Sequence, residues 1–356
     1  MNFYTENNDT ALEAKEKAQR IAFAPVVFQA SRVLRDSGIL EAVDQSGDAG
    51  IRLDDVVRKV QLPLYGVRVL LESGLSIGLV VYRNEKYFLT KTGYFILHDE
   101  LTRVNMDFIH DVCYLGLFSL DKSVQTGKPE GLKVFGTWNT IYQALSQLPP
   151  EVQKSWFAFD HFYSDTAFPQ ALQAVFKSSP RRLLDIGGNT GKWAIACTAH
   201  DPEVEVTIMD LPGQLEMAKK KIGEMGLTNR VHFYQANILE ETQEFPKHFD
   251  AIWMSQFLDC FSENEITSIL KRCRQAIEPN GKVYILEPFW DRQRFETASF
   301  CLQQTSLYFT ALANGNSQMY HSGTFLDCVR KAGFEVEAEV NEIGLSHTLL
   351  ILKGKN

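Results

Sequence analysis

A glycine-rich turn after an apolar strand is the stretch of the sequence that most directly suggests chemistry. It reads Leu183-Leu-Asp-Ile-Gly-Gly-Asn-Thr-Gly191. In an open α/β sheet, ligands bind beyond the carboxyl ends of the strands, and glycine at the first turn lets the backbone approach them. A dinucleotide-binding GxGxxG motif starting at Gly187 would need glycine at positions 189 and 192, which hold asparagine and lysine. The pattern present, Asp185-x-Gly187-x-x-x-Gly191, suits a ligand with an ammonium or sulfonium group better than a pyrophosphate, which needs bare helix N–H donors.

A second acidic residue ends the next apolar run. Asp210 closes Val206-Thr-Ile-Met, 19 residues after Gly191. A carboxylate at this place can accept hydrogen bonds from both hydroxyls of an adenosine ribose, as acidic residues do in NAD sites. Aspartate is common at strand ends, so it is the order of the two elements that predicts a nucleoside-type cofactor.

The elements that must position these residues alternate between strands and helices from residue 181 onward. Five apolar runs are strand candidates: residues 181–186, 204–209, 231–234, 250–254 and 282–287. Amphipathic segments such as residues 265–277 lie between most of them, which indicates a mostly parallel, doubly wound sheet. Residues 334–340 and 347–352 follow as two consecutive strands and predict an antiparallel hairpin at the sheet edge. That ending separates this fold from an ordinary dinucleotide-binding domain.

The N-terminal part has a different pattern. Short helices are expected around residues 26–36, 53–60 and 65–74, and the first of them ends at Gly38. Strand-like runs at 79–83 and 86–90 then flank a two-residue turn, Asn84-Glu85, which completes a winged-helix pattern. Residues 1–100 hold 12 Lys and Arg against 14 Asp and Glu, a net charge of −2, so no basic stripe is available for a phosphate backbone. We therefore expect a packing or dimerisation module, with a DNA-binding regulator as the less favoured alternative.

Length and composition agree with a globular chain of two domains. The chain has 356 residues, 45% hydrophobic and 22% charged, with a net charge of −8. We expect a winged-helix-like domain at 1–100, a helical connector at 101–178 that contributes to the substrate pocket, and a catalytic domain at 179–356. No run approaches the ~20 apolar residues that span a bilayer. The start lacks the features of a signal peptide, and the six cysteines show no metal-binding spacing, so we expect a cytoplasmic chain without a structural metal or a membrane partner.

Taken together, these motifs resemble the S-adenosylmethionine-dependent small-molecule O-methyltransferases of the plant caffeic-acid and bacterial polyketide-tailoring type. The resemblance covers nearly the whole chain and includes the residues 183–191, 207–212 and 282–287. It implies a Rossmann-like class I methyltransferase sheet with a C-terminal antiparallel hairpin, and a homodimer formed through the mostly helical N-terminal domain. It also implies S-adenosyl-L-methionine as cofactor. The residues it assigns to the cofactor are Asp185, Gly187, Gly188, Asn189, Gly191, Asp210, Leu211, Asn237, Ile238 and Ser255.

Two of these positions depart from the family pattern. Asn237 stands where the family usually has an aspartate on the adenine amine, and its amide oxygen can still accept that hydrogen bond. Ile238 falls at the hydrophobic wall of the adenine. Ser255 replaces a frequent lysine, which removes one cofactor contact.

The largest departure concerns the catalytic base. The family places a histidine after the fourth strand, where this chain has Asp259 in Met254-Ser-Gln-Phe-Leu-Asp-Cys-Phe. An aspartate with the ordinary pKa of about 3.9 is a poor base towards a phenol, whose pKa is about 10. Burial in an apolar pocket would raise the pKa of the carboxyl, but we do not expect burial alone to raise it enough.

A histidine further along the chain offers a second candidate base. His321 neighbours the position at which the family has one of two glutamates that flank its histidine, and Glu287 matches the other. We hypothesise an inverted dyad in which His321 is the base and Asp259, with Glu287, orients it. The alternative is that His321 only caps its helix.

The acceptor implied by the resemblance is a small hydroxylated aromatic molecule. Phe159 and Tyr163 align with a segment that packs on the acceptor, and Trp290 follows Glu287 closely enough to form another wall. Core packing is the alternative for each aromatic residue, and His161 competes with His321 as proton acceptor. An activated phenol is also nucleophilic at its ortho carbon, so aromatic C-methylation remains open beside O-methylation. A homologue that binds the cofactor without methylating, and an NAD-linked oxidoreductase, which the failed GxGxxG motif disfavours, are the remaining alternatives.

Overall fold

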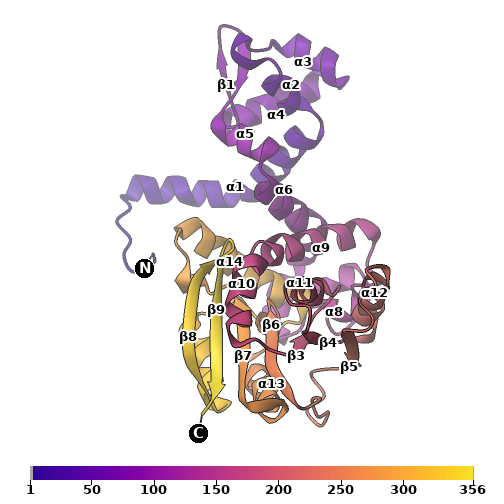
Figure 1. Cartoon of the computed structure of the whole chain (residues 1–356). Coiled ribbons are helices and arrows are strands. Elements are labelled where there is room, and N and C mark those ends of the chain that lie inside the picture. The colour runs from indigo at the N-terminus through magenta and orange to yellow at the C-terminus, as the bar shows by residue number, and fades with distance from the viewer. Residues whose placement is uncertain (1–2, 356) are drawn as a thin grey trace. The chain divides into compact units, whose positions relative to one another are not determined.

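A computed structural model describes residues 3–355 of the chain. The chain divides into two compact units, residues 4–109 and residues 110–355, the latter grouped with Phe3 (Figure 1). Each unit is described by itself. None of the helices in the described range combines the length and apolar content that crossing a lipid bilayer requires.

The N-terminal unit is the predicted arrangement of helices followed by a hairpin. Its helices are α1 (Ala11–Asp36), α2 (Ile39–Asp44), α3 (Leu53–Val60), α4 (Leu64–Ser76), α5 (Lys91–His98) and α6 (Glu100–Asp107). The strands β1 (Val80–Arg83) and β2 (Lys86–Leu89) pair in antiparallel fashion. Asn84 and Glu85 both adopt positive φ angles, of 48° and 59°, as a tight hairpin turn requires.

Helix α1 is longer than the sequence predicted. It ends at Asp36 before Gly38, as expected, but it begins at Ala11 and runs for 26 residues. Thr10 starts it with a capping box in which Glu13 takes part. The apolar spacing predicted only the C-terminal part of the helix, and most side chains of the first half are exposed.

The segment before the large sheet is helical, as expected. Its main helices are α7 (Leu120–Thr126), α8 (Ile141–Ala144), α9 (Pro150–Asp165) and α10 (Phe168–Val175), with shorter turns η2 (Phe108–Cys113), η3 (Gly116–Ser119), η4 (Glu130–Val134) and η5 (Phe176–Ser178) between them.

The large sheet has seven strands in the order β5-β4-β3-β6-β7-β9-β8. They are β3 (Arg182–Ile186), β4 (Glu205–Asp210), β5 (Val231–Gln235), β6 (Phe249–Ser255), β7 (Ile277–Glu287), β8 (Phe334–Ile343) and β9 (His347–Gly354). The strands β3 to β7 are parallel, whereas β9 is antiparallel to both β7 and β8. The predicted doubly wound sheet with a terminal hairpin at its edge is therefore confirmed.

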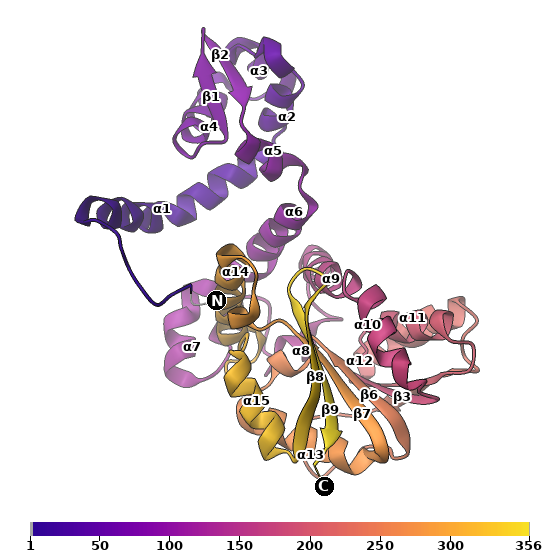
Figure 2. The same ribbon diagram turned by 60° about the vertical axis from the view of Figure 1, so that its left-hand side comes forward.

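Helices cover both faces of the sheet (Figures 1 and 2). They are α10, α11 (Lys192–His200) and α12 (Pro212–Glu224) on one face, and α13 (Glu263–Ala276) and α15 (Ser322–Lys331) on the other. The helix α14 (Glu296–Tyr308) and the short turns η6 (Leu258–Cys260), η7 (Trp290–Arg292) and η8 (Phe309–Ala313) belong to the same unit. Successive strand residues point to opposite faces. Leu184 packs in the cluster with α13 and α15, whereas Leu183 packs in the cluster with α10, α11 and α12.

Two tryptophans join the first helix after β3 to strand β6. The rings of Trp193 and Trp253 stack with centroids 3.9 Å apart and planes within 13° of parallel. Both side chains are buried. Trp193 lies two residues after Gly191 and Trp253 two residues before Ser255, so the stack fixes α11 to β6 directly behind the predicted cofactor residues.

Candidate active site

The glycine-rich turn lies between the end of β3 and the start of α11, at the carboxyl edge of the sheet. Gly187 has a φ of +76° and Gly191 a φ of +79°, a backbone conformation that other residues rarely adopt. A Cβ atom at Gly187 would overlap the ring of Phe257, and one at Gly188 would overlap the carboxyl of Asp185. The backbone of this turn is therefore closely packed and leaves no space for a Cβ atom at either glycine.

Asp210, at the end of the neighbouring strand β4, holds this turn in place. One carboxylate oxygen accepts from the backbone N–H of Asn189 at 2.9 Å, and the other accepts from that of Leu211 at 2.7 Å. Burial raises the pKa of Asp210 to about 6, although both hydrogen bonds act in the opposite direction. Each oxygen keeps a further lone pair, so the side chain can still accept from hydroxyl groups.

Several polar atoms around the turn are buried without a hydrogen-bond partner among the described residues. They are Oδ2 of Asp185, Oδ1 of Asn189 and Oγ of Ser255. Asp185 is only 2% exposed, so it lies beneath the turn. Buried polar groups are normally paired, and unpaired ones at the edge of a sheet mark a place where a ligand supplies the partner.

The residues predicted for the adenine lie after β5. The amide oxygen of Asn237 accepts from the backbone N–H of Leu239 at 3.2 Å, and its amide nitrogen donates to Glu240 at 3.4 Å. Ile238 packs against the core on the α13 side of the sheet. The Asn237 side chain is thus partly engaged in its own turn, with one lone pair of its oxygen left for another donor.

The carboxyl groups predicted to take part in catalysis lie in and beside the turn η6, which follows β6. Asp259 is 4% exposed and Glu287, at the end of β7, is 1% exposed. Oε1 of Glu287 accepts from the backbone N–H groups of Phe257 and Leu258, at 3.0 and 2.8 Å, and so fixes the turn that carries Asp259. Its other oxygen is buried without a partner in the described structure.

Both carboxyls have raised pKa values. Burial raises the pKa of Asp259 to about 7, and the charge of Asp160 acts in the same direction. Burial and the charge of Asp259 raise the pKa of Glu287 well above its ordinary value. Two neighbouring carboxyls in a dry site cannot both ionise easily, so the pair holds a proton near neutral pH.

His321 occupies a different position from the one that the inverted dyad requires. It is exposed at the N-cap of α15, where Nδ1 accepts from the backbone N–H of Gly323 at 2.9 Å. Its Nε2 lies 3.6 Å from Asp291. No hydrogen bond or ion pair between His321 and Asp259 is present in residues 3–355, so the arrangement is that of a helix-capping residue, the alternative considered above.

Two aromatic side chains near the turn η6 were not recognised from the sequence. Tyr142 of α8 has a buried hydroxyl that interacts with the thiol of Cys260, and Tyr308 of α14 accepts from Nε1 of Trp156 at 2.8 Å. They come from helices distant in the sequence, and no local motif distinguishes them from core aromatic residues.

Of the three aromatic residues predicted to line the acceptor pocket, the structure brings two into contact. Phe159 and Tyr163 on α9 have ring centroids 5.0 Å apart. Trp290 instead packs against His321, with centroids 5.0 Å apart. His161 is half-buried, 3.4 Å from the hydroxyl of Thr190, and burial lowers its pKa to about 4.

Comparisons with known proteins show the family of the chain. A Dimerisation2-like domain profile matches residues 15–87, and an O-methyltransferase domain profile matches residues 118–335. The chain belongs to the O-methyltransferase domain family. It is therefore an S-adenosylmethionine-dependent methyltransferase, and the predicted family, enzyme class and cofactor are confirmed.

Individual relatives of this methyltransferase are distant. The L-tyrosine C(3)-methyltransferase of Streptomyces lavendulae is 25% identical over 273 residues, 76% of this chain and 73% of that protein. The 3-hydroxy-5-methyl-1-naphthoate 3-O-methyltransferase of Streptomyces sahachiroi is 26% identical over 171 residues, and each chain is covered to 48%, about half its length. The solved apo structure of the S-adenosylmethionine-dependent methyltransferase SibL has a TM-score of 0.71 at 24% identity, covering 95% of this chain and 98% of that one. This last similarity shows the fold.

The geometry of the methyltransferase fits its cofactor. The bare backbone at Gly187, the strand-end carboxylate of Asp210 and the unpaired polar atoms of Asn189 and Ser255 lie at the carboxyl ends of β3, β4 and β6. This is the edge at which open α/β sheets bind their ligands.

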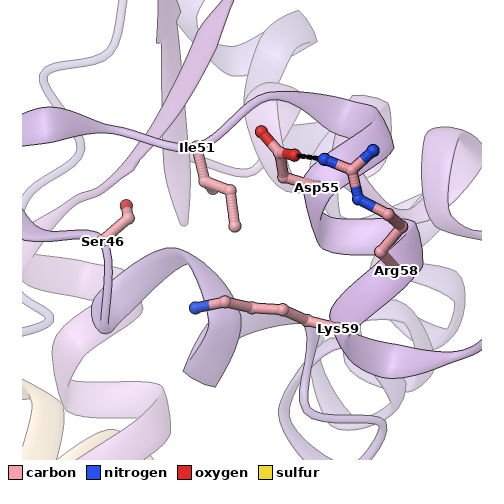
Figure 3. Close-up of a pocket in the computed structure, with 5 residues that line it drawn as sticks. All are labelled: Ser46, Ile51, Asp55, Arg58 and Lys59. Carbon is pink, nitrogen blue, oxygen red and sulfur yellow. Dashed lines mark hydrogen bonds and ion pairs between the residues drawn. The ribbon is translucent and has the colours of Figure 1, made fainter.

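A separate hollow of about 440 Å³ lies in the N-terminal unit, lined by Ser46, Ile51, Asp55, Arg58 and Lys59 (Figure 3). Arg58 pairs with Asp55, while Lys59 extends below Ile51. Both basic side chains are exposed and no buried polar group lines the hollow, so it lacks the features of a built binding site.

Proposed function

We propose that this methyltransferase moves the methyl group of S-adenosylmethionine to a phenolic hydroxyl of a small aromatic acceptor, with Asp259 as the base. The observation that carries the proposal is the buried carboxyl of Asp259, whose pKa is raised to about 7, at the position of the family's histidine. General base catalysis is most efficient when the pKa of the base lies near the pH at which the enzyme works.

An aspartate of ordinary pKa is a weak base towards a phenol, and the raised pKa of Asp259 makes this difference smaller. An ordinary aspartate lies about six pKa units below a phenol, whereas Asp259 lies about three below. That gap is close to the one between a free histidine and a phenol. Burial thus gives a carboxyl the basicity that the family obtains from an imidazole.

The two histidines near the site are weaker candidates. His161 has its pKa lowered to about 4 by burial, which makes it a poorer base than Asp259. His321 is exposed at the N-cap of α15 and its recorded contacts are with Asp291, Gly323 and the ring of Trp290.

The proposed roles follow from these positions. S-adenosylmethionine supplies an electrophilic methyl group and leaves as a neutral thioether. Asp259 accepts the phenolic proton as the acceptor oxygen forms its new bond to carbon, and Glu287 stays protonated and holds the turn η6. Gly187 faces the methionine part of the cofactor, Asp210 the ribose, and Asn237 with Ile238 the adenine. Phe159 and Tyr163 form a wall of the acceptor pocket.

Aromatic C-methylation is the second candidate, because the relative from Streptomyces lavendulae that aligns over 76% of this chain carries the name of a tyrosine C(3)-methyltransferase. The ortho carbon of the phenolate would then form the bond, and the ring proton would leave to a base to restore aromaticity. The same Asp259 serves both outcomes, because each begins with loss of the phenolic proton.

Kinetics of two variants test the base. Asp259→Asn is expected to lower kcat by about 100-fold or more while the Kd for S-adenosylhomocysteine stays within about twofold. His321→Ala, the control, is expected to keep kcat within about threefold. The proposal fails if Asp259→Asn retains full turnover, or if His321→Ala alone loses it. Proton NMR of the product from a panel of phenols and phenolic amino acids then separates a methoxy group from an aryl methyl group.

We further propose that the chain forms a homodimer through its N-terminal unit. The Dimerisation2-like match supports this, as do exposed apolar side chains on α1, where Ile21 is 74% and Phe23 60% exposed. Light scattering after size-exclusion chromatography should give twice the 40.4 kDa chain mass. The double variant Ile21→Asp, Phe23→Asp should shift that mass towards a monomer, and an unchanged mass would place the interface elsewhere.

A further inference from the structure

Gln256, the residue that follows β6, joins this strand to three other elements of the C-terminal unit. Its amide nitrogen donates to the backbone carbonyl of Asp160 on α9 at 3.2 Å. Its amide oxygen lies 2.7 Å from Nε2 of His347, the first residue of β9. Its backbone N–H donates to the carbonyl of Leu286 on β7 at 2.9 Å. One residue thus connects the helix before the sheet, the end of β7 and the terminal hairpin.

The imidazole of His347 is the donor in its contact with Gln256. The amide nitrogen of Gln256 is used for Asp160, so the amide oxygen faces the imidazole and accepts from Nε2–H. His347 is 1% exposed, and burial lowers its pKa to about 4, so the ring is neutral at neutral pH and carries one proton. Nδ1 is then a lone-pair acceptor, buried without a partner in the part of the chain that the structure describes.

A polar pair at this place is unfavourable for packing alone. Leu349, two residues along β9 and so on the same face of the sheet, packs in an apolar cluster with Trp253 and Leu286. An apolar side chain at position 347 would extend that cluster and would leave no nitrogen unpaired, which is a state that costs free energy. The hydrogen bond to Gln256 is therefore what His347 contributes.

The backbone of Gln256 is also in an unfavourable conformation. Its φ is +48°, in the left-handed region that residues other than glycine rarely adopt. Such a conformation persists where surrounding contacts hold it, and it occurs most often at functional sites. The contacts that hold it here are the two hydrogen bonds of the side-chain amide and the backbone bond to β7.

The conformation of Gln256 determines where the next residues lie. The backbone N–H groups of Phe257 and Leu258 both donate to Oε1 of Glu287. Asp259 follows directly, in the same turn η6. A change at Gln256 therefore moves the turn that carries the proposed base.

The other end of the connection lies on the helix proposed to line the acceptor pocket. Asp160, whose carbonyl accepts from Gln256, is the next residue in the sequence after Phe159. The amide of Gln256 thus links the turn of the base to the helix of the acceptor wall, and His347 fixes that amide from the side of β9.

We infer that Gln256 and His347 are positioning residues that hold the turn carrying Asp259 at a fixed place relative to the acceptor wall on α9, an assignment that rests on the proposed roles of Asp259 and Phe159. The two residues act through the turn and do not touch the reacting atoms. Their effect on turnover follows because a displacement of about 1 Å at a reacting group can lower a rate by about 100-fold.

Hydrogen exchange of the full chain, followed by mass spectrometry, tests the connection without any acceptor. In His347→Leu, peptides that cover residues 256–261 should exchange about tenfold faster, because the turn loses an anchor and opens locally more often. In His347→Gln, whose amide supplies an N–H donor near the place of Nε2, exchange should stay within about twofold. His232→Leu makes the same replacement at an exposed position of β5 and should leave the turn unchanged.

Kinetics separate positioning from a contribution to the fold alone. The acceptor is a phenol from the panel above that the parent chain methylates. His347→Leu should lower kcat by about tenfold while the Kd for S-adenosylhomocysteine stays within about threefold, and His347→Gln should keep kcat within about threefold of the parent.

A variant of the other partner shows whether the two residues act together. Asparagine tolerates a left-handed backbone, but its side chain is one methylene shorter, so Gln256→Asn should also lower kcat by about tenfold. The double variant Gln256→Asn, His347→Leu should be within about twofold of either single variant, because each change removes the same connection.

Unchanged exchange of the turn in both His347→Leu and Gln256→Asn would overturn the inference. Faster exchange with unchanged kcat would also overturn it, because the contact would then serve the fold alone. Effects that multiply in the double variant would show two independent contacts and reject a shared connection. Failure of the proposed function would appear separately, as full turnover in Asp259→Asn or as no phenol methylated, while the exchange rates keep the order given above.

Discussion

At the scale of single residues, the turn after β3 has no room for a side chain at Gly187. Gly187 combines a φ of +76° with a ring of Phe257 packed where a Cβ would lie. A side chain at this position would both strain the backbone and displace the aromatic ring. The conformation of this turn therefore requires that position 187 has no Cβ atom.

We predict that Gly187→Ala raises the Kd for S-adenosylhomocysteine by at least about tenfold, since the left-handed conformation costs about 1–2 kcal/mol for alanine before any clash. Calorimetry measures the change. Gly223→Ala in α12 is the control, because a Cβ there meets nothing within 4 Å and alanine favours helix. Unchanged binding by the Gly187 variant would mean that the cofactor does not approach this turn.

The pKa of Asp259 predicts a pH dependence. A general base acts in its deprotonated form, so kcat should fall as pH decreases through about 7 and reach a plateau above it. The titratable groups that act on Asp259 are Glu287, Cys260 and Asp160. A kcat that stays constant from pH 5 to pH 9 would exclude a base of this kind. If the inflection instead remains in Asp259→Asn, it belongs to another group.

The same carboxyl affects stability with a definite sign. The pKa of Asp259 in the folded chain lies above the unfolded value of about 3.9, so the folded state binds the proton more tightly. Its contribution to stability is fully present below about pH 4 and is lost as pH rises towards 7. A buried carboxylate at neutral pH is therefore retained at a cost to the fold, as is common for groups that serve catalysis.

At the scale of elements, the sequence predicted those parts of the fold that local patterns determine. Apolar runs located all seven strands of the large sheet, and the glycine stop located the end of α1. The sequence could place Asp185 and Asp210 at the carboxyl edge of the sheet because a strand end has a fixed place in a parallel sheet. The positions of Tyr142 and Tyr308 near the turn η6 could not be predicted, because these residues lie on helices whose faces are set by tertiary packing. Their spacing in the sequence carries no sign of the shared site.

The helix α13, which follows the turn η6, begins with a capping box. Ser262 caps α13, its backbone N–H and hydroxyl both donating to Glu265 at 2.7 Å, in a reciprocal capping box. We predict that Ser262→Ala lowers the free energy of unfolding by about 1 kcal/mol. Denaturant unfolding measures this change. The control, Thr267→Ala, removes an exposed bond within the same helix and should change stability by less than about 0.5 kcal/mol. Equal decreases in the free energy of unfolding for the two variants would show that the cap contributes no more than the exposed hydrogen bond of Thr267.

At the scale of the whole molecule, all five tryptophans lie in the C-terminal unit, at positions 138, 156, 193, 253 and 290. Tryptophan fluorescence therefore reports the unfolding of residues 110–355 alone, whereas far-ultraviolet circular dichroism reports the helices of both units. We predict that S-adenosylhomocysteine at about 100 times its Kd stabilises the fluorescence transition by about 2.7 kcal/mol.

The dichroism should then keep a component that the ligand does not shift, because the glycine-rich turn and the strand-end carboxylates all belong to the unit with the sheet. A single transition that moves as a whole would show that the two units unfold cooperatively. The ligand-free protein at the same concentration is the reference for both probes.

The stacked indoles of Trp193 and Trp253 have an optical consequence. Two indoles with centroids 3.9 Å apart are close enough to couple their electronic excitations. Where their transition dipoles are rotated relative to one another within the stacked planes, circular dichroism is expected to show a paired band of opposite signs, a couplet, in the absorption region of the indole ring. We expect this couplet without any ligand, and Trp193→Phe should abolish it. The stack joins α11 to β6. If a variant no longer binds the cofactor but keeps the couplet, then α11 and β6 still hold their relative positions. Loss of binding and loss of structure can then be told apart in one spectrum.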